Sequence, residues 1–526
     1  MQSIFRKFLW LLALGALSHV SLEAQIIPQV SETFIDNSTG ISQVAVDART
    51  INGCERSVVA WDGTNPGLAW DDHCGNAGQL TLPPGITYLD VAIYEGAFFD
   101  HLALVFIIGG DVYVRGYSWQ AGSYVQVPGS THILSTMNNA QDCQMDSDDA
   151  GRAVITWMEI SNNVERVIMA RAYSMLFLFP NGPEFDISTN AIPAYMRSPA
   201  PPFTNVARPD VTIATYGQAF PPTVHFSYLV YDPDGNTHLF YQYEEFINVL
   251  SGTPAFPFVL QPAHTAPPLV SLGYPRISAL TTDNTYSLEG QATVVFDEQD
   301  LTSGESRIYT LNGMIGGAIL INVFGGEACT NQNPSITMTR CEEYVVAWEY
   351  DDLIGCGLPN LPAGTGADLI GLALDDLGFP LGSDYQILNT SFGTGGQYEY
   401  GPKLAGRFSQ QMTSAYFDSN EDVYRKISPC SSSLPFFRTE RPAATDLRLF
   451  PNPGTEQVRL VHAWEQAVDT HIEVVDVMGR TVAAVDLGLT DHVDWTYPAA
   501  HLAEGVYWVR LRMGERQEVR KWLKKE

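Results

Sequence analysis

Two short acidic stretches hold the residue types and the spacing that suit a calcium ion. Asp146 and Asp148 lie in the stretch 146–151, and Asp232 and Asp234 lie in the stretch 232–236. An Asp-x-Asp pair near a glycine gathers several oxygens on a tight backbone curve, which suits Ca²⁺. Neither stretch has the bidentate glutamate of an EF-hand loop, and Asx-rich hairpin turns have the same composition without a metal. The sequence predicts calcium at these four aspartates, with plain hairpin turns as the alternative.

Recognised catalytic motifs are missing. The sequence has no Gly-x-Ser-x-Gly, no His-Glu-x-x-His and no P-loop. Carboxylates that could hydrolyse glycosides are abundant, but abundance does not place two of them at working distance. We therefore expect a binding protein rather than an enzyme, and we keep a secreted polysaccharide hydrolase as the alternative.

Strands must position these side chains, because no long segment has the 3.6-residue period of an amphipathic helix. From Ile41 onward, hydrophobic runs alternate with stretches rich in Gly, Pro, Asn and Asp. Seven of these runs end in an aromatic residue, and their mean spacing is about 60 residues. The runs end at Trp61, Phe106, Trp157, Tyr231, Phe296, Trp348 and the pair Tyr416-Phe417.

A second recurrent feature precedes four of the aromatic runs. It is a Pro-x-aliphatic tripeptide that begins at Pro209, Pro275, Pro334 or Pro402. Proline fits the first residue of a strand, since no ladder hydrogen bond is needed from its nitrogen there. We expect each tripeptide to begin the strand that comes before the aromatic one.

A strand repeat of this length is typical of a β-propeller with one four-stranded sheet per blade. The prediction is an all-β chain whose residues 25–428 form a seven-bladed propeller with the aromatic residues packed between blades. The segment 26–35 could supply the strand that closes the ring with the last blade. A row of β-sandwich modules is the alternative. Residues 429–445 have the Pro- and Ser-rich composition of a linker.

Four short motifs follow one another at the C-terminal end. They are Phe450-Pro451-Asn452-Pro453, the Asp-x-x-Gly-Arg turn ending in Gly479-Arg480, the Leu-x-x-Gly-x-Tyr stretch with Gly505 and Tyr507, and a basic closing stretch. Together they resemble the type A C-terminal sorting domain of type IX secretion system cargo. The resemblance implies a small β-sandwich over residues 446–526 that the type IX translocon recognises. The sorting residues that it implies are Pro451, Asn452, Pro453, Gly479, Arg480, Gly505 and Tyr507.

The other end of the chain agrees with export. Residues 1–24 have the basic start, the apolar centre and the cleavage site of a secretory signal peptide. No other window approaches the roughly 18 apolar residues of a membrane-spanning helix. We therefore expect an exported protein, at the cell surface or extracellular, without a transmembrane segment.

The net charge limits the possible binding partners, and the cysteines indicate a disulfide. The formal net charge is −30 at pH 7, and nearly all of the excess lies before residue 441, which argues against nucleic-acid binding. Seven cysteines in an oxidising compartment permit disulfides, and the spacing suggests a Cys54–Cys74 pair. The expected function is that of an exported body that binds carbohydrate or protein. A cluster of carboxylates with an Arg or His at one channel mouth would favour the hydrolase alternative.

Overall fold

The computed structural model describes residues 30–524 with gaps, the longer of which are 197–204, 253–261, 283–291, 322–329, 352–368, 388–398 and 430–447. The chain divides into two compact units, Met1–Phe437 and Arg438–Glu526, which are described separately. The signal peptide expected over 1–24 lies outside the described residues. None of the described helices has the length and apolar character needed to cross a bilayer.

The described strands of the first unit form seven sheets, and in each sheet the main strands follow one another in chain order as antiparallel neighbours. Sheet 1 contains β2 (Val44–Ile51), β3 (Cys54–Trp61), β4 (Gly67–Asp71) and β5 (Ala77–Thr81). Sheet 2 contains β6 (Thr87–Glu95), β7 (Asp100–Ile108), β8 (Asp111–Gln120) and β9 (Ser123–Ile133). Sheet 3 contains β10 (Gln141–Ser147), β11 (Arg152–Ser161), β12 (Glu165–Ser174), β13 (Phe179–Pro180) and β14 (Phe185–Asp186).

The next four sheets repeat this order. Sheet 4 contains β15 (Val206–Tyr216), β16 (Thr223–Tyr231), β17 (Thr237–Glu245) and β18 (His264–Ala266), with helix α2 (Phe246–Ser251) after β17 and β21 (Thr281–Thr282) beside β15. Sheet 5 contains β19 (Val270–Leu272), β20 (Arg276–Ala279), β22 (Ala292–Asp300), β23 (Ser306–Asn312) and β24 (Ile319–Leu320). Sheet 6 contains β25 (Thr330–Met338), β26 (Tyr344–Asp351), β27 (Leu369–Leu374) and β28 (Gln386–Ile387). Sheet 7 contains β29 (Glu399–Ala405), β30 (Gln411–Asp418), β31 (Asp422–Pro429) and β1 (Val30–Asn37).

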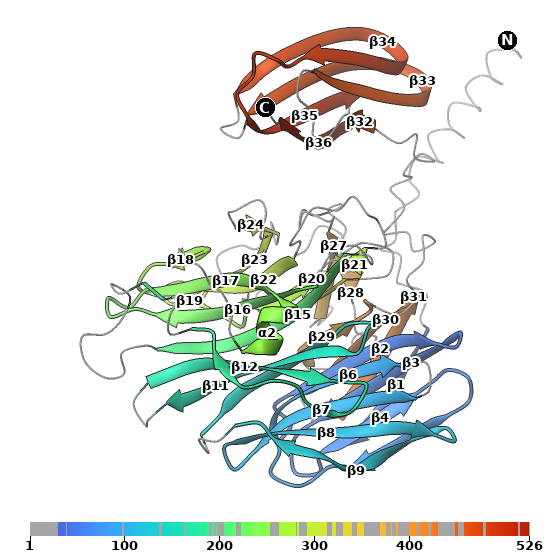
Figure 1. Ribbon diagram of the computed structural model, residues 1–526, viewed down its shortest axis with the longest axis vertical. Coiled ribbons are helices and arrows are strands. Elements are labelled where there is room, and N and C mark those ends of the chain that lie inside the picture. The colour runs from blue at the N-terminus through green and yellow to red at the C-terminus, as the bar shows by residue number, and fades with distance from the viewer. Residues whose placement is uncertain are drawn as a thin grey trace, which may run out of the picture. The chain divides into compact units, whose positions relative to one another are not determined.

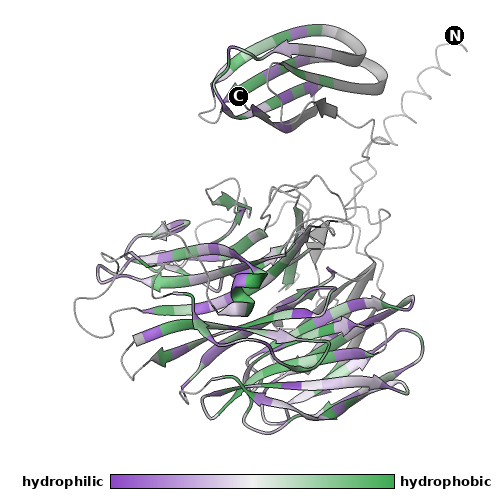
Figure 2. Cartoon of the chain, viewed as in Figure 1, coloured by the Kyte–Doolittle hydropathy of each residue, from purple (hydrophilic) through white to green (hydrophobic). Residues whose placement is uncertain are grey.

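The second strands of the sheets are deeply buried. In β7 and in β16 every residue between the two terminal ones is buried. A strand that is covered on both faces has a continuous hydrophobic run rather than an alternating one. Outer strands such as β5 alternate between exposed and half-buried residues instead. Figure 2 shows hydrophobic and hydrophilic segments following one another along the strands of this unit.

Seven aromatic side chains lie at equivalent positions of these second strands, and each is at most 1 % exposed. They are Trp61, Phe106, Trp157, Tyr228, Phe296, Trp348 and Tyr416. In each sheet, the residue three positions earlier pairs with the corresponding residue of the first strand, as Val58 pairs with Asp47 and Val345 with Thr337. The expectation is confirmed for six sheets. In sheet 4 the equivalent residue is Tyr228, not Tyr231, because Tyr231 ends the strand half-buried.

The sheets pack against one another in a closed cycle. Seven hydrophobic clusters each join two neighbouring sheets, and every aromatic residue of this set belongs to the cluster shared with the preceding sheet. The first strand of each sheet also contacts the first strand of the next, and β29 contacts β2. The fold is therefore all-β and propeller-like, as Figure 1 shows for the arrangement of strands β1 to β31.

Sheet 7 combines two distant parts of the chain. Strand β1 pairs antiparallel with β31, with Val30 opposite Ile427 and Asn37 opposite Asp422. This is the pairing expected for the segment that begins at residue 26. Arg425 then joins sheet 7 to sheet 1, because its guanidinium donates to Ser57 Oγ at 3.1 Å and to Asp71 Oδ2 at 2.8 Å.

The expected position is wrong for three of the four prolines, whereas Pro275 directly precedes β20 as expected. Pro209, Pro334 and Pro402 lie inside β15, β25 and β29, at breaks in the pairing register. An extra residue at a β-bulge leaves the ladder locally unpaired, so a proline costs no hydrogen bond there. The residue before each of these prolines has a positive φ, of 57°, 52° and 61° respectively.

The second unit is one antiparallel sheet of β32 (Arg448–Phe450), β33 (Gln457–Asp476), β34 (Thr481–Pro498), β35 (Gly505–Met513) and β36 (Arg516–Lys524). Strand β33 breaks register between Ala463 and Val468, and β35 pairs only with its second part. Both parts contribute to one core, where Leu460 and Val474 join Trp522. The two-sheet sandwich expected here stays a prediction, since hydrogen bonds connect all five described strands.

The cysteine prediction is confirmed for one pair. Cys54 and Cys74 form a disulfide with a Cα–Cα distance of 5.9 Å. Cys143 is a buried free thiol. The other four cysteines lie outside the described residues.

Candidate functional site

A cavity of about 130 Å³ lies where the first strands of all seven sheets meet. Two rings of residues, each with one member per sheet, are defined by the pairing register with the second strands. The first ring is Ala45, Asp90, Gln144, Asp210, Arg276, Ser335 and Lys403. The second ring, two residues further along each strand, is Asp47, Ala92, Asp146, Thr212, Ser278, Thr337 and Ala405. All of these residues except Ala45 line the cavity.

The ring carboxylates connect neighbouring sheets. Asp90 Oδ2 accepts the Met145 amide at 2.8 Å, and Asp210 Oδ2 accepts the Ile277 amide at 2.9 Å. Asp47 and Asp146 do the same in the second ring, accepting the amides of Ile93 and Ile213 at 2.6 and 2.8 Å. The other oxygen of each carboxylate accepts the amide of the residue that follows it.

Serines make the corresponding connection in the later sheets. Ser278 Oγ accepts the Met338 amide at 3.0 Å, and Ser335 Oγ accepts the Leu404 amide at 3.1 Å. Every link joins one sheet to the next in chain order. The ring oxygens therefore hold the first strands together, which is a structural role.

Burial changes the acidity of these groups. It raises the pKa of Asp47 to about 6, against the attraction of Arg49 and the amides of Ile93 and Ala48. It also raises the pKa of Asp90 and of Asp210, although nearby cations and amides oppose the change. Removal of a carboxyl group from bulk water favours its neutral form in this way.

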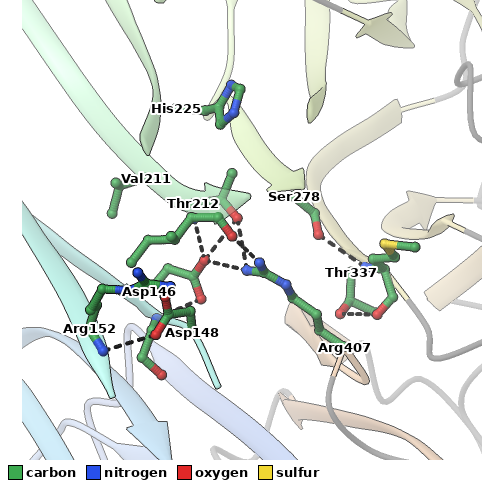
Figure 3. A network of polar contacts seen from close by, with 12 residues as sticks. Asp146, Asp148, Arg152, Val211, Thr212, His225, Ser278, Thr337 and Arg407 are labelled. Carbon is green, nitrogen blue, oxygen red and sulfur yellow. Dashed lines mark hydrogen bonds and ion pairs between the residues drawn. The ribbon is translucent and has the colours of Figure 1, made fainter. Parts of the chain in front are cut away.

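Three cations line the same cavity. Arg407 is fully engaged, since it donates to Asp146 Oδ2 at 2.7 Å, to Thr212 Oγ1 at 3.4 Å and to the Ile213 carbonyl, as Figure 3 shows. Lys403 and Arg276 differ: in the part of the chain that the structure describes, neither makes a hydrogen bond or an ion pair within 4.0 Å. Burial, followed by the charge of Arg276, lowers the pKa of Lys403.

Beside the cavity, where the first strands begin, Tyr88, Asp142, Arg208 and Tyr274 lie near one another, and we refer to this cluster as the mouth. Two residues before the first ring, Tyr88, Asp142 and Arg208 all have φ near +50°, at 48°, 50° and 57°. The Arg208 guanidinium lies 4.0 Å from the centre of the Tyr274 ring. Burial raises the pKa of Asp142, and Arg276 and Arg208 oppose that rise. Aromatic rings and charged groups of both signs therefore lie together in this cluster.

The first pair of aspartates predicted to bind calcium makes other contacts in the structure. Asp146 belongs to β10 and the second ring rather than to a turn. Asp148 is fully buried and accepts from the Ala150 amide and from the Arg152 amide and Nε. Figure 3 shows this pair beside the Arg407 contacts.

The second acidic stretch is a hydrogen-bonded turn. Asp232 accepts from the amides of Asp234 and Asn236, from Asn236 Nδ2 and from His238 Nε2. Calcium needs six to eight oxygens, whereas N–H groups already occupy these ones. In the described residues no group of three or more His, Cys, Asp or Glu is placed to hold a metal. The structure therefore lends no support to calcium at Asp146, Asp148, Asp232 or Asp234.

The structure describes three of the seven residues that are predicted to carry the sorting signal. Pro451, Asn452, Pro453 and Gly479 lie outside the described residues. The amide and Nε of Arg480 donate to Asp476 at 2.9 and 2.8 Å, closing the turn after β33.

The remaining two sorting residues lie in β35. Gly505 begins this strand. The Tyr507 hydroxyl donates to the Ala503 carbonyl at 2.9 Å, and its ring lies 5.7 Å from that of Trp522, centre to centre. Tyr507 therefore contributes to the core of the second unit.

Comparison with known families assigns the second unit. Residues 448–525 match the family described as the secretion system C-terminal sorting domain. The chain is therefore an exported protein that carries its sorting signal in a separate C-terminal unit. It is a cargo protein of the type IX secretion system, delivered to the cell surface or the extracellular space. No protein with a curated description matches the chain.

Several solved structures weakly resemble about three quarters of the chain. A protein of unknown function from Dyadobacter fermentans is 8 % identical with a TM-score of 0.41, over 77 % of this chain and 100 % of that one. The alpha-L-arabinanase of Penicillium chrysogenum, complexed with arabinobiose, is 11 % identical with a TM-score of 0.37, over 76 % and 99 %. The Aleuria aurantia lectin, complexed with alpha-methyl-L-fucoside, is 9 % identical with a TM-score of 0.32, over 77 % and 100 %. Similarity at this level assigns no ligand to the chain.

A buried carboxyl group near the mouth gives a test of these electrostatics. Asp297 in β22 is 7 % exposed, and its Oδ1 has no hydrogen-bond partner among the described residues. Burial raises its pKa from 3.8 to about 7, although Arg208 opposes the change. The unfolded chain releases this proton near pH 4 and the folded chain only near pH 7. The free energy of unfolding therefore falls as the pH rises through this window.

Asp297→Asn should remove this fall in the free energy of unfolding at higher pH. We expect the variant to be more stable than the wild type at pH 8, on the order of 3 kcal/mol, and similar to it at pH 4. Thermal unfolding across this pH range measures the difference. Asp300→Asn is the matched control, because Asp300 lies on the same strand with an exposed carboxylate. An equal gain from both variants would contradict the assignment.

Proposed function

We propose that the first unit is a seven-bladed β-propeller, in which sheets 1 to 7 are the blades, and that it binds carbohydrate at the mouth of its central cavity. The arrangement of the mouth carries this proposal. Tyr88 and Tyr274 provide aromatic faces, and Arg208 and Asp142 add charged hydrogen-bonding groups at the same entrance. Sugar sites combine aromatic surface with a few convergent polar groups in this manner.

The hydrolase alternative is also supported by an observation. Asp90, Asp142 and Asp210 are close enough to Lys403 to change its pKa, and Arg276 lies among them. A cluster of carboxylates with an arginine is the feature that would favour the hydrolase. Asp90 and Asp210, however, already accept backbone amides with both oxygens. A general acid must reach a glycosidic oxygen, so binding is the function that this geometry supports better.

A polysaccharide panel tests both functions. The chain from Gln25 to Glu526 is incubated with soluble polysaccharides, and retention and released reducing ends are measured together. We expect retention of at least one polysaccharide without hydrolysis. Tyr274→Ala should reduce retention at least tenfold, whereas Phe177→Ala, which removes a ring that is 68 % exposed on the β12–β13 turn, should not. Release of reducing ends that Asp142→Asn abolishes would instead establish the hydrolase.

A further inference from the structure

Lys403 and Arg276 are two cations on the wall of one cavity with no ionic contact in the described part of the chain. They lie in the first ring, on sheets 7 and 5, with Ser335 of sheet 6 between them in ring order. Arg407, which follows Lys403 by four residues, differs from these two cations. Its N–H groups donate to Asp146, Thr212 and Ile213. Cations enclosed by protein are usually paired, since an unpaired buried charge is costly.

The first ring also holds two carboxylates near these cations. Asp90 and Asp210 lie on sheets 2 and 4, and their oxygens are committed to backbone amides. Among the described residues, the ring therefore has carboxylates that already accept backbone amides, and an ammonium and a guanidinium group without a hydrogen-bond acceptor. Its unmet hydrogen-bonding capacity is that of donors, which a carboxylate group would satisfy.

We propose that Lys403 and Arg276 bind the carboxylate of an acidic sugar, so that the cavity selects uronic acids over neutral sugars. This inference rests on the proposed carbohydrate-binding function and specifies its ligand class. A cavity of about 130 Å³ is smaller than the roughly 300–1,000 Å³ of pockets that enclose a whole drug-sized ligand. It therefore accommodates one charged end or substituent, while the rest of the saccharide contacts the mouth at Tyr88, Arg208 and Tyr274.

Non-specific attraction cannot replace these two cations. The formal net charge of the chain is −30 at pH 7, so the protein as a whole repels polyanions at long range. Retention of an acidic saccharide would consequently depend on a short-range site, and moderate salt should weaken the repulsion rather than the recognition.

Affinity for the acidic saccharide should fall as the pH rises from about 6 to about 9. The groups that face Lys403 are Arg276, Asp90, Asp210 and Asp142. Burial lowers the pKa of Lys403 and raises that of Asp90. A rising pH therefore removes a positive charge from the cavity and adds a negative one, and both changes oppose carboxylate binding.

The test compares matched ligands on the chain from Gln25 to Glu526. The probes are oligosaccharides of galacturonate, of alginate and of hyaluronan, each beside its carboxyl-reduced counterpart, with dissociation constants measured by calorimetry. We expect at least one acidic form to bind tenfold or more tightly than its reduced counterpart. Lys403→Met and Arg276→Gln should each bring that ratio below about two. Arg307→Gln is the control, because it removes the same charge from a half-exposed site on β23.

The outcomes separate the two proposals. Equal binding of acidic and reduced forms, or a ratio that survives Lys403→Met, would overturn the carboxylate site and leave carbohydrate binding intact. Binding of sulfated dextran as tight as that of the uronates would overturn the selection for carboxylate. Failure to bind any saccharide would overturn the proposed function itself. Lys403→Met should unfold at or above the wild-type temperature, since burial already disfavours its charge, so a loss of the ratio is not a loss of the fold.

Discussion

Removal of residues 444–526 should stop export at the periplasm while the first unit stays folded. The deletion takes away the whole region that matches the sorting family, 448–525, and leaves the first unit, whose boundary lies at Phe437. Seven hydrophobic clusters and the β1–β31 pairing all lie within the retained residues, so folding of that unit does not depend on the tail. Fractionation of periplasm, cell surface and medium, in a host with the type IX translocon, measures the result.

Two controls make this experiment specific. Residues 444–526 fused behind a signal peptide and a neutral reporter should send the reporter outside. Arg480→Ala in the complete chain should lower export severalfold, because it removes the contacts from Arg480 to Asp476 that close the turn after β33. Tyr497→Phe, in the same unit, is the matched control. Surface exposure of the truncated chain would show that the sorting address lies elsewhere.

Trp348→Ala should lower the free energy of unfolding by about 3–5 kcal/mol, as large aromatic truncations in cores do. Trp348 is 1 % exposed and lies in the cluster between sheets 5 and 6. Its Nε1 donates to Asn331 Oδ1 at 2.9 Å, so the truncation also leaves a buried amide oxygen without this donor. Denaturant unfolding of the first unit, followed by intrinsic fluorescence and circular dichroism, gives the difference.

The same truncation can be compared at aromatic residues in equivalent positions of other sheets. Trp61→Ala and Trp157→Ala should cost a similar amount, because both residues are fully buried at the same position of their sheets. Phe177→Ala, at a ring that is 68 % exposed, should change stability by less than about 0.5 kcal/mol. A Trp348→Ala cost as small as that of Phe177→Ala would place Trp348 outside the core.

The architecture was accessible from the sequence because its signal is hydrophobic and periodic. A second strand covered on both faces must be apolar along most of its length, and it carries a large ring that packs against the preceding sheet. The sequence of the seven aromatic strands shows both features, although in sheet 4 the buried ring belongs to Tyr228 and not to Tyr231. The tail was recognisable for a different reason, since several specific motifs occur there in a fixed order.

The cavity residues were not accessible in the same way. In the tripeptides that begin at Pro209, Pro275 and Pro402, the middle residues Asp210, Arg276 and Lys403 line the cavity, yet they share neither charge nor size. Their common property is a register relation to the neighbouring sheets, which appears only after folding. The acidic neighbours of Asp146 predict a turn, whereas the pairing of Asp146 with Val154 puts it on a first strand.

The first unit closes only when sheet 7 is complete, because this sheet combines the N-terminal strand β1 with strands β29 to β31. Val30 is synthesised long before its partner Ile427, so the cycle of sheets stays open while most of the chain is made. The segment that brings β31 is followed directly by the sorting unit. A chain that ends before β31 therefore has an unpaired sheet edge and also lacks the sorting domain. Such a chain should be open and sensitive to proteases, and only a chain that includes both β31 and the sorting domain should be closed and exported.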